Sequence, residues 1–427
     1  MFNRNSLLSS AAGLAVLLSV LAAGVAQASV GYLLQGQGFR YKALSGAGVA
    51  LHLDPTAAAL NPGAMAFVPG GYDVSMSVIL PNSKYTVTGE PSADQDTYFG
   101  LEPGEYSGEQ TLMVAPTISG NWSLNEDETF FLGLTIFSQG GMKTEYAHGV
   151  YDASAQPTGV DLTQMTAMPT LSYMLGERHG LGFSPLFTMQ RYRARGLQPL
   201  GDRGWSSDPE NLTNKGTDTM LGYGVRIGYL GEWLDLMSVG VSYQTKTYMS
   251  ASTDYAGWLA EQGILENPAS WTAGVAFGFV GMGLALDVQQ ALHSDLKSLG
   301  NPLLPNLDDA LLGDDEGAGP GWENTLSFRM GAWYQTNSGW MVRLGFATGD
   351  QPVADSETFF NILTPQVAKH QVSLGLSRPL GFDNEIGIVV AYGLENTLTG
   401  VNPLETSGAQ TIALTSSQWE VGLGLSF

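Results

Sequence analysis

The stretch Trp419-Glu420-Val421-Gly422-Leu423-Gly424-Leu425-Ser426-Phe427 alternates apolar residues with small or polar ones and ends on an aromatic residue. Because successive side chains of a strand point to opposite sides, the apolar residues share one face and the others share the second face. This pattern is typical of the closing strand of an outer-membrane β-barrel, with lipid on one side and the lumen on the other.

Residues 1–28 predict a cleaved secretion signal. Arg4 supplies a positive charge, 14–25 is an apolar core, and Ala26-Gln27-Ala28 fits the small-x-small cleavage pattern. A single membrane anchor is the alternative, but the apolar run is too short and no charge cluster follows it. We therefore expect a secreted chain.

The composition favours a barrel over a bundle of membrane helices. Downstream of residue 28 no run reaches the ~18 to 20 apolar residues that a spanning helix needs, although 44% of the residues are hydrophobic. Since only helices and closed barrels satisfy the backbone in lipid, we predict an all-β, antiparallel transmembrane barrel in the outer membrane of a Gram-negative cell. The net charge of -22 disfavours nucleic acid as a partner. The absence of cysteine fits an oxidising periplasm and removes cysteine-based metal sites.

About fourteen segments alternate over the ~9 or more residues that a tilted barrel strand requires. An even number suits a bacterial barrel. The segments are 71–81, 111–121, 129–138, 165–177, 180–193, 217–230, 234–249, 270–279, 281–290, 323–336, 339–349, 366–379, 384–395 and 415–427.

The parity of these segments assigns their faces. In 217–230 Arg226 shares its face with glycines, and in 323–336 Arg329 shares its face with small residues. An arginine on the lipid side would cost ~2 to 4 kcal/mol near the midplane, so we place both arginines in the lumen, with Arg343, Lys246 and Asp287. The residues predicted to face lipid are Leu221, Tyr223, Val225, Ile227 and Tyr229 in the first segment and Leu326, Phe328, Met330 and Tyr334 in the second.

The connections divide into long and short ones. We predict extracellular loops over 85–109 and 146–164, and periplasmic hairpins over 177–180 and 335–339. Residues 254–263 differ, because 255–263 is compatible with a brief helix that ends at a glycine. Its Trp258 and Leu259 either form an apolar ligand-capture site outside the barrel wall or pack on neighbouring loops.

Residues 29–68 are not barrel-like. They lack two-residue alternation and carry several glycines and apolar side chains that prefer burial. A barrel of this width needs a plug or else leaves a water channel, so we predict that 29–68 forms a hatch inside the lumen and that 69–427 forms the barrel. The residues expected to gate passage are Asn61, Pro62, Gly63, Met65 and Phe67.

Three stretches resemble the FadL family of outer-membrane transporters for long-chain fatty acids and other hydrophobic compounds. The first is the hatch segment, with Ser45-Gly46-Ala47-Gly48 and Asp54-Pro55-Thr56-Ala57-Ala58-Ala59-Leu60-Asn61-Pro62-Gly63-Ala64-Met65. The second is Asp287-Val288-Gln289-Gln290 with Asp295-Leu296-Lys297-Ser298-Leu299-Gly300-Asn301-Pro302. The third is Gly349-Asp350-Gln351-Pro352 with Phe359-Phe360-Asn361-Ile362-Leu363-Thr364-Pro365.

This resemblance implies a 14-stranded barrel, closed by a hatch, that carries hydrophobic molecules inward without an energy source. Ligand would be collected at an apolar groove among the extracellular loops and would move to a deeper pocket beside the hatch. It would leave by a rearrangement of the hatch or through an opening in the barrel wall. This sequence has Gly63 where the family often has alanine, which loosens the local backbone.

Aliphatic walls alone can bind an acyl chain, since each buried methylene contributes ~0.8 kcal/mol. A lumen cation would then orient a carboxylate. The alternative for each such cation is an ion pair with a neighbouring acid. The candidates are Arg191, Arg226, Lys246, Arg329 and Arg343.

Two other classes of protein remain as alternatives. A lipid-modifying enzyme would need a nucleophile with a histidine and an acid, or a metal site; the five histidines form no recognisable motif, and no Gly-x-Ser-x-Gly or His-Glu-x-x-His occurs. A general porin would lack the apolar segment 29–68. We expect no enzyme activity, cofactor or metal. The expected partners are a hydrophobic ligand, outer-membrane lipid with lipopolysaccharide, and the barrel-assembly machinery, which the terminal Phe427 would engage.

Overall fold

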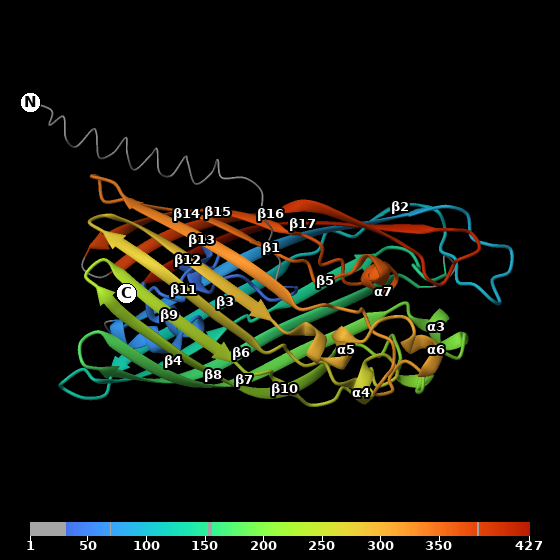
Figure 1. The fold of residues 1–427 in the computed structure, drawn as a ribbon, viewed down its shortest axis with the longest axis horizontal. Coiled ribbons are helices and arrows are strands. Elements are labelled where there is room, and N and C mark those ends of the chain that lie inside the picture. Colours follow the sequence, from blue (N-terminus) through green and yellow to red (C-terminus); the bar gives the residue numbers. More distant parts are fainter. Residues whose placement is uncertain (1–30, 69, 153–155, 382–383) are drawn as a thin grey trace, which may run out of the picture.

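The computed structural model describes residues 31–68, 70–152, 156–381 and 384–427. The predicted secretion signal, 1–28, lies outside the described residues. Most of the described chain forms one antiparallel sheet (Figure 1). Its strands are β1 Gly71–Thr88, β2 Gly104–Ser107, β3 Met113–Ser123, β4 Phe130–Phe137, β5 Gly141–Tyr146, β6 Thr158–Leu175, β7 His179–Arg195, β8 Asp218–Leu234, β9 Met237–Gln244, β10 Tyr248–Met249, β11 Ser270–Phe279, β12 Met282–Ala291, β13 Thr325–Gln335, β14 Met341–Gly349, β15 His370–Gly381, β16 Asn384–Val401 and β17 Thr411–Ser426.

The sheet closes on itself, because β1 pairs with β17 from Asp73 opposite Ser426 to Thr88 opposite Thr411. Three short strands continue a longer one: β2 and β3 both pair with β1, β4 and β5 both pair with β6, and β9 and β10 both pair with β8. The 17 strands of the described residues therefore occupy 14 positions in the wall. This confirms the predicted 14-stranded barrel.

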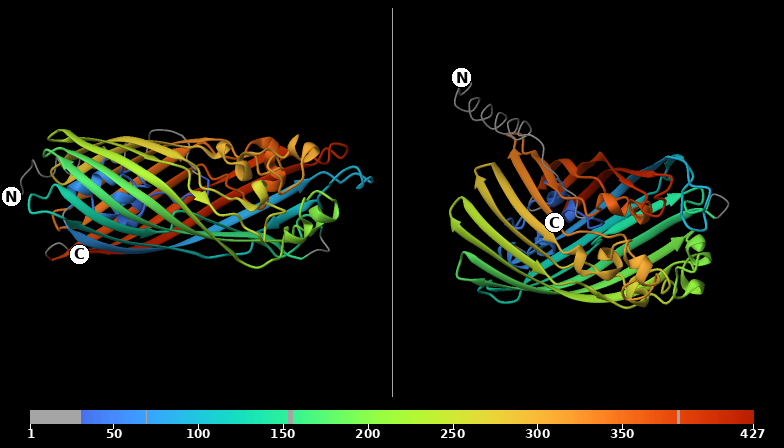
Figure 2. Two further views of the ribbon diagram at one scale, coloured as in Figure 1. Left: turned by 90° about the horizontal axis from the view of Figure 1, so that it is seen from below. Right: turned by 45° about the vertical axis from the view of Figure 1, so that its right-hand side comes forward.

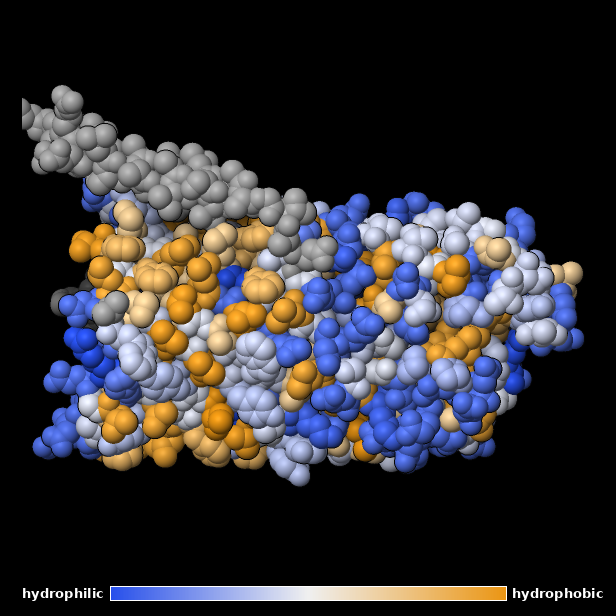
Figure 3. Space-filling model, in the orientation of Figure 1, coloured by the Kyte–Doolittle hydropathy of each residue, from blue (hydrophilic) through white to orange (hydrophobic). Residues whose placement is uncertain are grey.

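Alternation along each strand separates a lipid face from a lumen face. In β8 Leu221, Tyr223 and Ile227 are 65%, 63% and 48% exposed, whereas the side chain of Arg226 points into the lumen and lines a cavity there. The closing strand behaves in the same way, with Trp419, Val421, Leu423 and Leu425 all exposed on the outer surface. Figure 3 shows the apolar residues gathered over one half of the barrel, while hydrophilic residues predominate over the other half.

The two ends of the barrel differ. At one end the connections are short, including 176–178 and 336–340, as predicted for periplasmic turns. At the other end lie the long loops and their helices (Figures 1 and 2). The helices of these loops are α3 Gln198–Asp202, η3 Pro209–Asn211, α4 Ala260–Gly263, η4 His293–Asp295, α5 Lys297–Gly300, α6 Asn306–Asp309, η5 Asp355–Glu357 and α7 Thr358–Asn361.

The predicted bounds of both long loops are wrong, and the brief helix within 255–263 is shorter than predicted, although it ends at Gly263 as expected. The expected loop 85–109 begins inside β1 and contains β2, and the expected loop 146–164 begins at the end of β5 and runs into β6. These strands continue beyond the apolar band, where lipid no longer imposes alternation on the sequence. The helix expected over 255–263 is reduced to α4, because Glu261 and Gln262 have left-handed φ values of 54° and 53° and Gly263 has φ 105°.

Residues 31–68 fold inside the lumen at the end with the short turns (Figures 1 and 2), as the predicted hatch. The hatch holds α2 Gly38–Lys42, η1 Pro55–Ala59 and η2 Pro62–Phe67. Proline begins both 3₁₀ helices, and the preceding side chains cap them: Asp54 accepts from the Thr56 amide at 2.8 Å, and Asn61 accepts from the Gly63 amide at 3.0 Å.

Lumen-facing glycines let the hatch approach the wall closely. A Cβ atom added at Gly182 would lie 2.1 Å from the carbonyl carbon of Pro62, and one added at Gly228 would lie 2.1 Å from the Asn61 side-chain oxygen. Around the barrel, Gly424 has no room for a Cβ beside the ring of Phe39. The wall thus forms a seat whose shape depends on the absence of side chains.

Candidate ligand path

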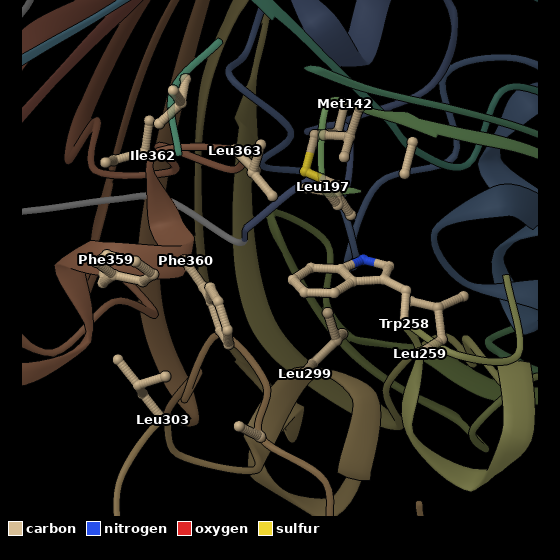
Figure 4. Close-up of a cluster of buried hydrophobic side chains, with 14 of the residues drawn as sticks. Met142, Leu197, Trp258, Leu259, Leu299, Leu303, Phe359, Phe360, Ile362 and Leu363 are labelled. Carbon is tan, nitrogen blue, oxygen red and sulfur yellow. The ribbon is translucent and has the colours of Figure 1, made fainter. Parts of the chain in front are cut away.

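The long loops and the ends of the adjoining strands contribute an apolar cluster of buried side chains, part of which Figure 4 shows. The rings of Trp258 and Phe360 pack edge to face with centroids 5.2 Å apart, and Met142, Leu299 and Leu363 surround them. Trp258 and Leu259 are only 9% and 5% exposed, and the indole nitrogen donates to the Tyr192 hydroxyl at 3.0 Å. The two residues pack on neighbouring loops, as the second of the two predicted alternatives has it, and a role in ligand capture stays a prediction. Within the cluster they border a cavity of about 40 Å³.

A second cavity, of about 70 Å³, lies where the barrel wall is interrupted between β4 and β5. There the amide of Leu34 donates to the Gln139 carbonyl, and the amide of Gly141 donates to the Tyr32 carbonyl, both at 3.1 Å. The start of the hatch segment therefore pairs with the break in the wall. Met142 lines both this cavity and the first one, so it separates them.

A third cavity, of about 80 Å³, lies between the hatch and the wall. Leu33 and Leu34 border both it and the second cavity. The three cavities thus form a series from the loops to the hatch. The third cavity differs in chemistry, because Arg226, Arg329 and Asp287 line it.

The two arginines of the third cavity have unused donors. Arg329 donates to the Gln289 side chain and Arg226 to the Gln244 side chain. Among the described residues, however, neither forms an ion pair, and Arg329 Nε and Arg226 Nη1 are buried without a partner. Asp287 uses its Oδ2 to accept from the amides of Gly48 and Val49, at 2.7 and 2.9 Å. Its Oδ1 is buried without a partner among the described residues, and Asp287 lies opposite Arg329 in the register of β12 and β13. Two cations still outnumber one carboxylate, so the cavity has a net positive charge, which suits an anionic group.

Comparison with known proteins agrees with this architecture. The family described as outer membrane protein transport protein (OMPP1/FadL/TodX) matches residues 19–399. The chain belongs to this family. It is therefore an outer-membrane transport protein with a barrel of the FadL/TodX type, as the resemblance in the sequence implied.

Solved structures share the fold at low sequence identity. The toluene transporter TodX of P. putida is similar with a TM-score of 0.66 and 17% identity, covering 92% of this chain and 98% of that one. A Pseudomonas aeruginosa FadL homologue has a TM-score of 0.67 and 15% identity, with 93% and 99% covered. The toluene transporter TbuX of Ralstonia pickettii has a TM-score of 0.56 and 16% identity, with 92% and 98% covered. No curated protein matches the sequence.

The other predicted cations of this FadL/TodX-family chain lie elsewhere. Arg343 pairs with Glu385 at 3.3 Å and donates to the Ser377 hydroxyl at 2.6 Å. Lys246 lies at the break between β9 and β10 and pairs with Glu266 at 2.7 Å. Arg191 as a lumen cation is wrong, because its exposed side chain is on the outer surface beside Met189 in the alternation of β7. The structure brings together only Arg226 and Arg329.

The five residues expected to gate passage all contact the wall or the rest of the hatch. Asn61 donates to the carbonyls of Val49 and Tyr229 at 2.7 and 2.8 Å, and the Pro62 carbonyl accepts from Ser172 at 2.5 Å. Gly63 is itself a close-approach glycine, against the carbonyl of residue 180. Met65 is fully buried, and Phe67 stacks on His52 with centroids 5.4 Å apart. Their gating role stays a prediction.

The sequence did not identify the ion pairs that hold the hatch. Arg40 of α2 pairs with Asp54 at 3.3 Å and with Glu385 of β16 at 2.5 Å, and Lys42 pairs with Glu420 of β17. Two basic residues in an otherwise apolar segment were the available signal, since buried lysine and arginine need partners. In the described part of the chain no group of three or more His, Asp or Glu residues could hold a metal ion.

Proposed function

We propose that this protein carries long-chain fatty acids passively across the outer membrane. One observation supports the cargo above the others: Arg226 and Arg329 lie unpaired beside the hatch, at the end of a series of cavities that begins in an apolar cluster. A molecule with a long apolar chain and one carboxylate matches both ends of this series. The small cavities imply that side chains such as Met142 and Leu34 move aside as the chain advances.

Uncharged hydrocarbons are the second candidate cargo. The first cavity supports them, because its lining is almost wholly apolar and contains Trp258 and Phe360. Such a cargo would be held by burial alone and would have no use for the two arginines. The third cavity therefore distinguishes the two candidates.

For exit, the interrupted wall is the favoured route. The second cavity is lined by Met142, which faces the lumen, and by Gly141 and Lys143, which alternate with it toward the outer surface. A ligand there would reach the wall by displacing only the start of the hatch segment, where Tyr32 and Leu34 bond to the break. The rest of the hatch, which hydrogen bonds and ion pairs hold in its seat, would stay in place. The alternative is exit through the periplasmic end of the lumen. This route requires the hatch to open at the predicted gate residues, which lie between 61 and 67.

The test compares binding and uptake of a long-chain acid with those of an alkane of similar length. Removing one charge-assisted hydrogen bond should cost ~1.5 to 3 kcal/mol for the acid and little for the alkane. We expect this selective loss in Arg329→Ala and Arg226→Ala. Arg343→Ala should affect both ligands alike, since Arg343 is paired, and Arg178→Ala, in a periplasmic turn, should affect neither.

Equal effects of Arg329→Ala and Arg226→Ala on acid and alkane, or no effect on either, would remove the fatty-acid proposal. That result would favour a neutral hydrocarbon as the cargo. Arg329→Lys is a useful companion variant because it retains the charge; it should keep most of the preference for the acid.

A further inference from the structure

A group of charged residues lies on the outer surface of the barrel, on β5, β6 and β7. We call it the outer-wall basic cluster; its members are Lys143, Glu145, Asp161, Arg191, Arg193 and Arg195. Strand register places Lys143 and Arg193 on either side of Asp161. It likewise places Glu145 and Arg195 on either side of Gly159, which has no side chain to keep them apart.

The cluster begins where the apolar band ends. On β7 the outward residues Leu181, Phe183, Phe187 and Met189 are 45%, 49%, 56% and 42% exposed, as expected for a lipid face. The next outward position is Arg191, followed by the arginines at 193 and 195. Since β7 runs from a periplasmic turn toward the long loops, the arginines lie at the extracellular boundary of the membrane. They span ~13 Å along the strand, at ~3.3 Å per residue.

The charge of the cluster is unusual for this protein. The chain has 18 Lys and Arg residues against 40 Asp and Glu residues. Here four cations meet only two carboxylates. Arg193 lies 3.7 Å from Asp161 and 4.0 Å from Glu145, Lys143 lies 3.5 Å from Asp161, and Arg195 pairs with Glu145. Arg191 forms no ion pair with any described residue. The cluster therefore has two more positive charges than negative ones.

These ion pairs leave the cations available. The paired side chains are 27% to 31% exposed, and exposed pairs contribute only ~0 to 1 kcal/mol each. A phosphate can therefore compete for the guanidinium groups, which bind phosphate oxygens through two parallel hydrogen bonds. The two acids hold the arginines in place without neutralising them.

We propose that the outer-wall basic cluster binds the phosphate groups of the glycolipid in the outer leaflet, the lipid A part of lipopolysaccharide. The acyl chains would lie against Phe183, Phe187 and Met189, and the phosphorylated sugars would lie against Arg191, Arg193 and Arg195. Basic pockets at the edge of a membrane-spanning surface recognise lipid head groups in this way. Of the cations in the cluster only Lys143 borders the second cavity; Arg191, Arg193 and Arg195 line none of the three cavities, so they can be changed without altering the path of the cargo.

The test measures binding of bisphosphorylated lipid A to the purified full-length barrel in mild detergent. Arg191→Gln/Arg193→Gln/Arg195→Gln should weaken binding tenfold or more. Enzymatically dephosphorylated lipid A should bind wild-type protein as weakly as it binds the triple variant. Arg178→Gln is the matched control, because its arginine is also exposed but lies in a periplasmic turn; it should bind like wild type.

A second variant keeps the proposal testable if the triple variant inserts poorly. Glu145→Gln/Asp161→Asn removes the competing carboxylates, so we expect it to bind bisphosphorylated lipid A several-fold more tightly. Equal affinity of wild-type and triple-variant protein, or equal affinity for phosphorylated and dephosphorylated lipid A, would overturn the proposal. Equally tight binding of phosphatidylglycerol vesicles would also overturn it, by reducing the cluster to a surface for any anionic lipid.

Discussion

The two ends of the lumen are built on opposite principles. At the hatch end, backbone packs against backbone: glycines at 182, 228 and 424 admit the hatch, and Arg40 and Lys42 pair with acids of the wall. At the loop end, large apolar side chains such as Trp258 and Phe360 pack together but leave cavities. Between the loops and the hatch, Arg226 and Arg329 line a further cavity and form no ion pair with a described residue. Close-packed regions resist deformation. The difference therefore indicates a fixed plug below an adaptable binding region.

The largest expected effect comes from removing the plug. Deletion of residues 31–66 should leave an inserted, heat-modifiable barrel that leaks small polar solutes, because these residues fill the lumen at its periplasmic end. Influx of a small sugar into proteoliposomes measures the leak, and intact protein run in parallel is the control. Unchanged permeability of a correctly inserted deletion variant would contradict the plug assignment.

Much of this fold could be predicted from the sequence, because lipid imposes a pattern on each strand. All fourteen predicted segments overlap a wall strand, and 270–279 has the same bounds as β11. The breaks that separate β5 and β10 from longer strands were not predictable. The break after Phe137, for instance, depends on hydrogen bonds to Leu34 and Tyr32, which are distant in the sequence.

The candidate site could be predicted only in part. Parity placed Arg226 and Arg329 in the lumen, but their proximity depends on how β8 and β13 curve around the barrel. Arg191 shows the opposite failure. The parity of its own segment, which it shares with Phe187 and Met189, places Arg191 on the outer surface. We predicted a lumen position because an arginine in contact with lipid is costly, but this cost no longer applies beyond the apolar band.

In the loop region, Trp258→Ala should have the next largest effect. Truncating a buried tryptophan typically costs ~3 to 5 kcal/mol, and here it would also enlarge the first cavity and remove the hydrogen bond to Tyr192. We expect weaker binding of hydrophobic ligands and faster proteolysis of the loops. Trp233→Ala, at a position that is 56% exposed, is the control. Identical loop protection in the two variants would show that the cluster does not hold the loops together.

In the hatch seat, Gly182→Ala should act locally. The new methyl group would lie 2.1 Å from backbone of Pro62, and overpacking of this kind costs ~1 to 3 kcal/mol. We expect partial release of the hatch, seen as a small solute leak and a lower unfolding midpoint. Gly278→Ala adds the same methyl group to a wall strand with nothing within 4 Å. If the two variants behave alike, the hatch does not depend on close approach at 182.

The smallest expected effect is a pH dependence in the loop region. His293 is fully buried against Trp322, with ring centroids 5.4 Å apart, and neither ring nitrogen has a partner among the described residues. Burial lowers the pKa of His293 from 6.5 to about 4. Between these two values the unfolded chain binds the proton and the folded chain does not. The stability of the folded state therefore falls as the pH drops through this window and loses nothing more below it.

At pH 5.5 the loss should be about 1 kcal/mol relative to pH 7. Denaturant unfolding at both pH values measures it in wild type and in His293→Phe, which keeps a ring against Trp322 but cannot take up a proton. Other groups also titrate in this range, so only the difference between the two proteins counts. We expect the phenylalanine variant to lose less stability on acidification. An equal loss of stability in both proteins would contradict this prediction. It would mean that His293 is protonated in the folded state without disturbing the loops. The loop end would then be packed more loosely than the burial of the His293 ring indicates.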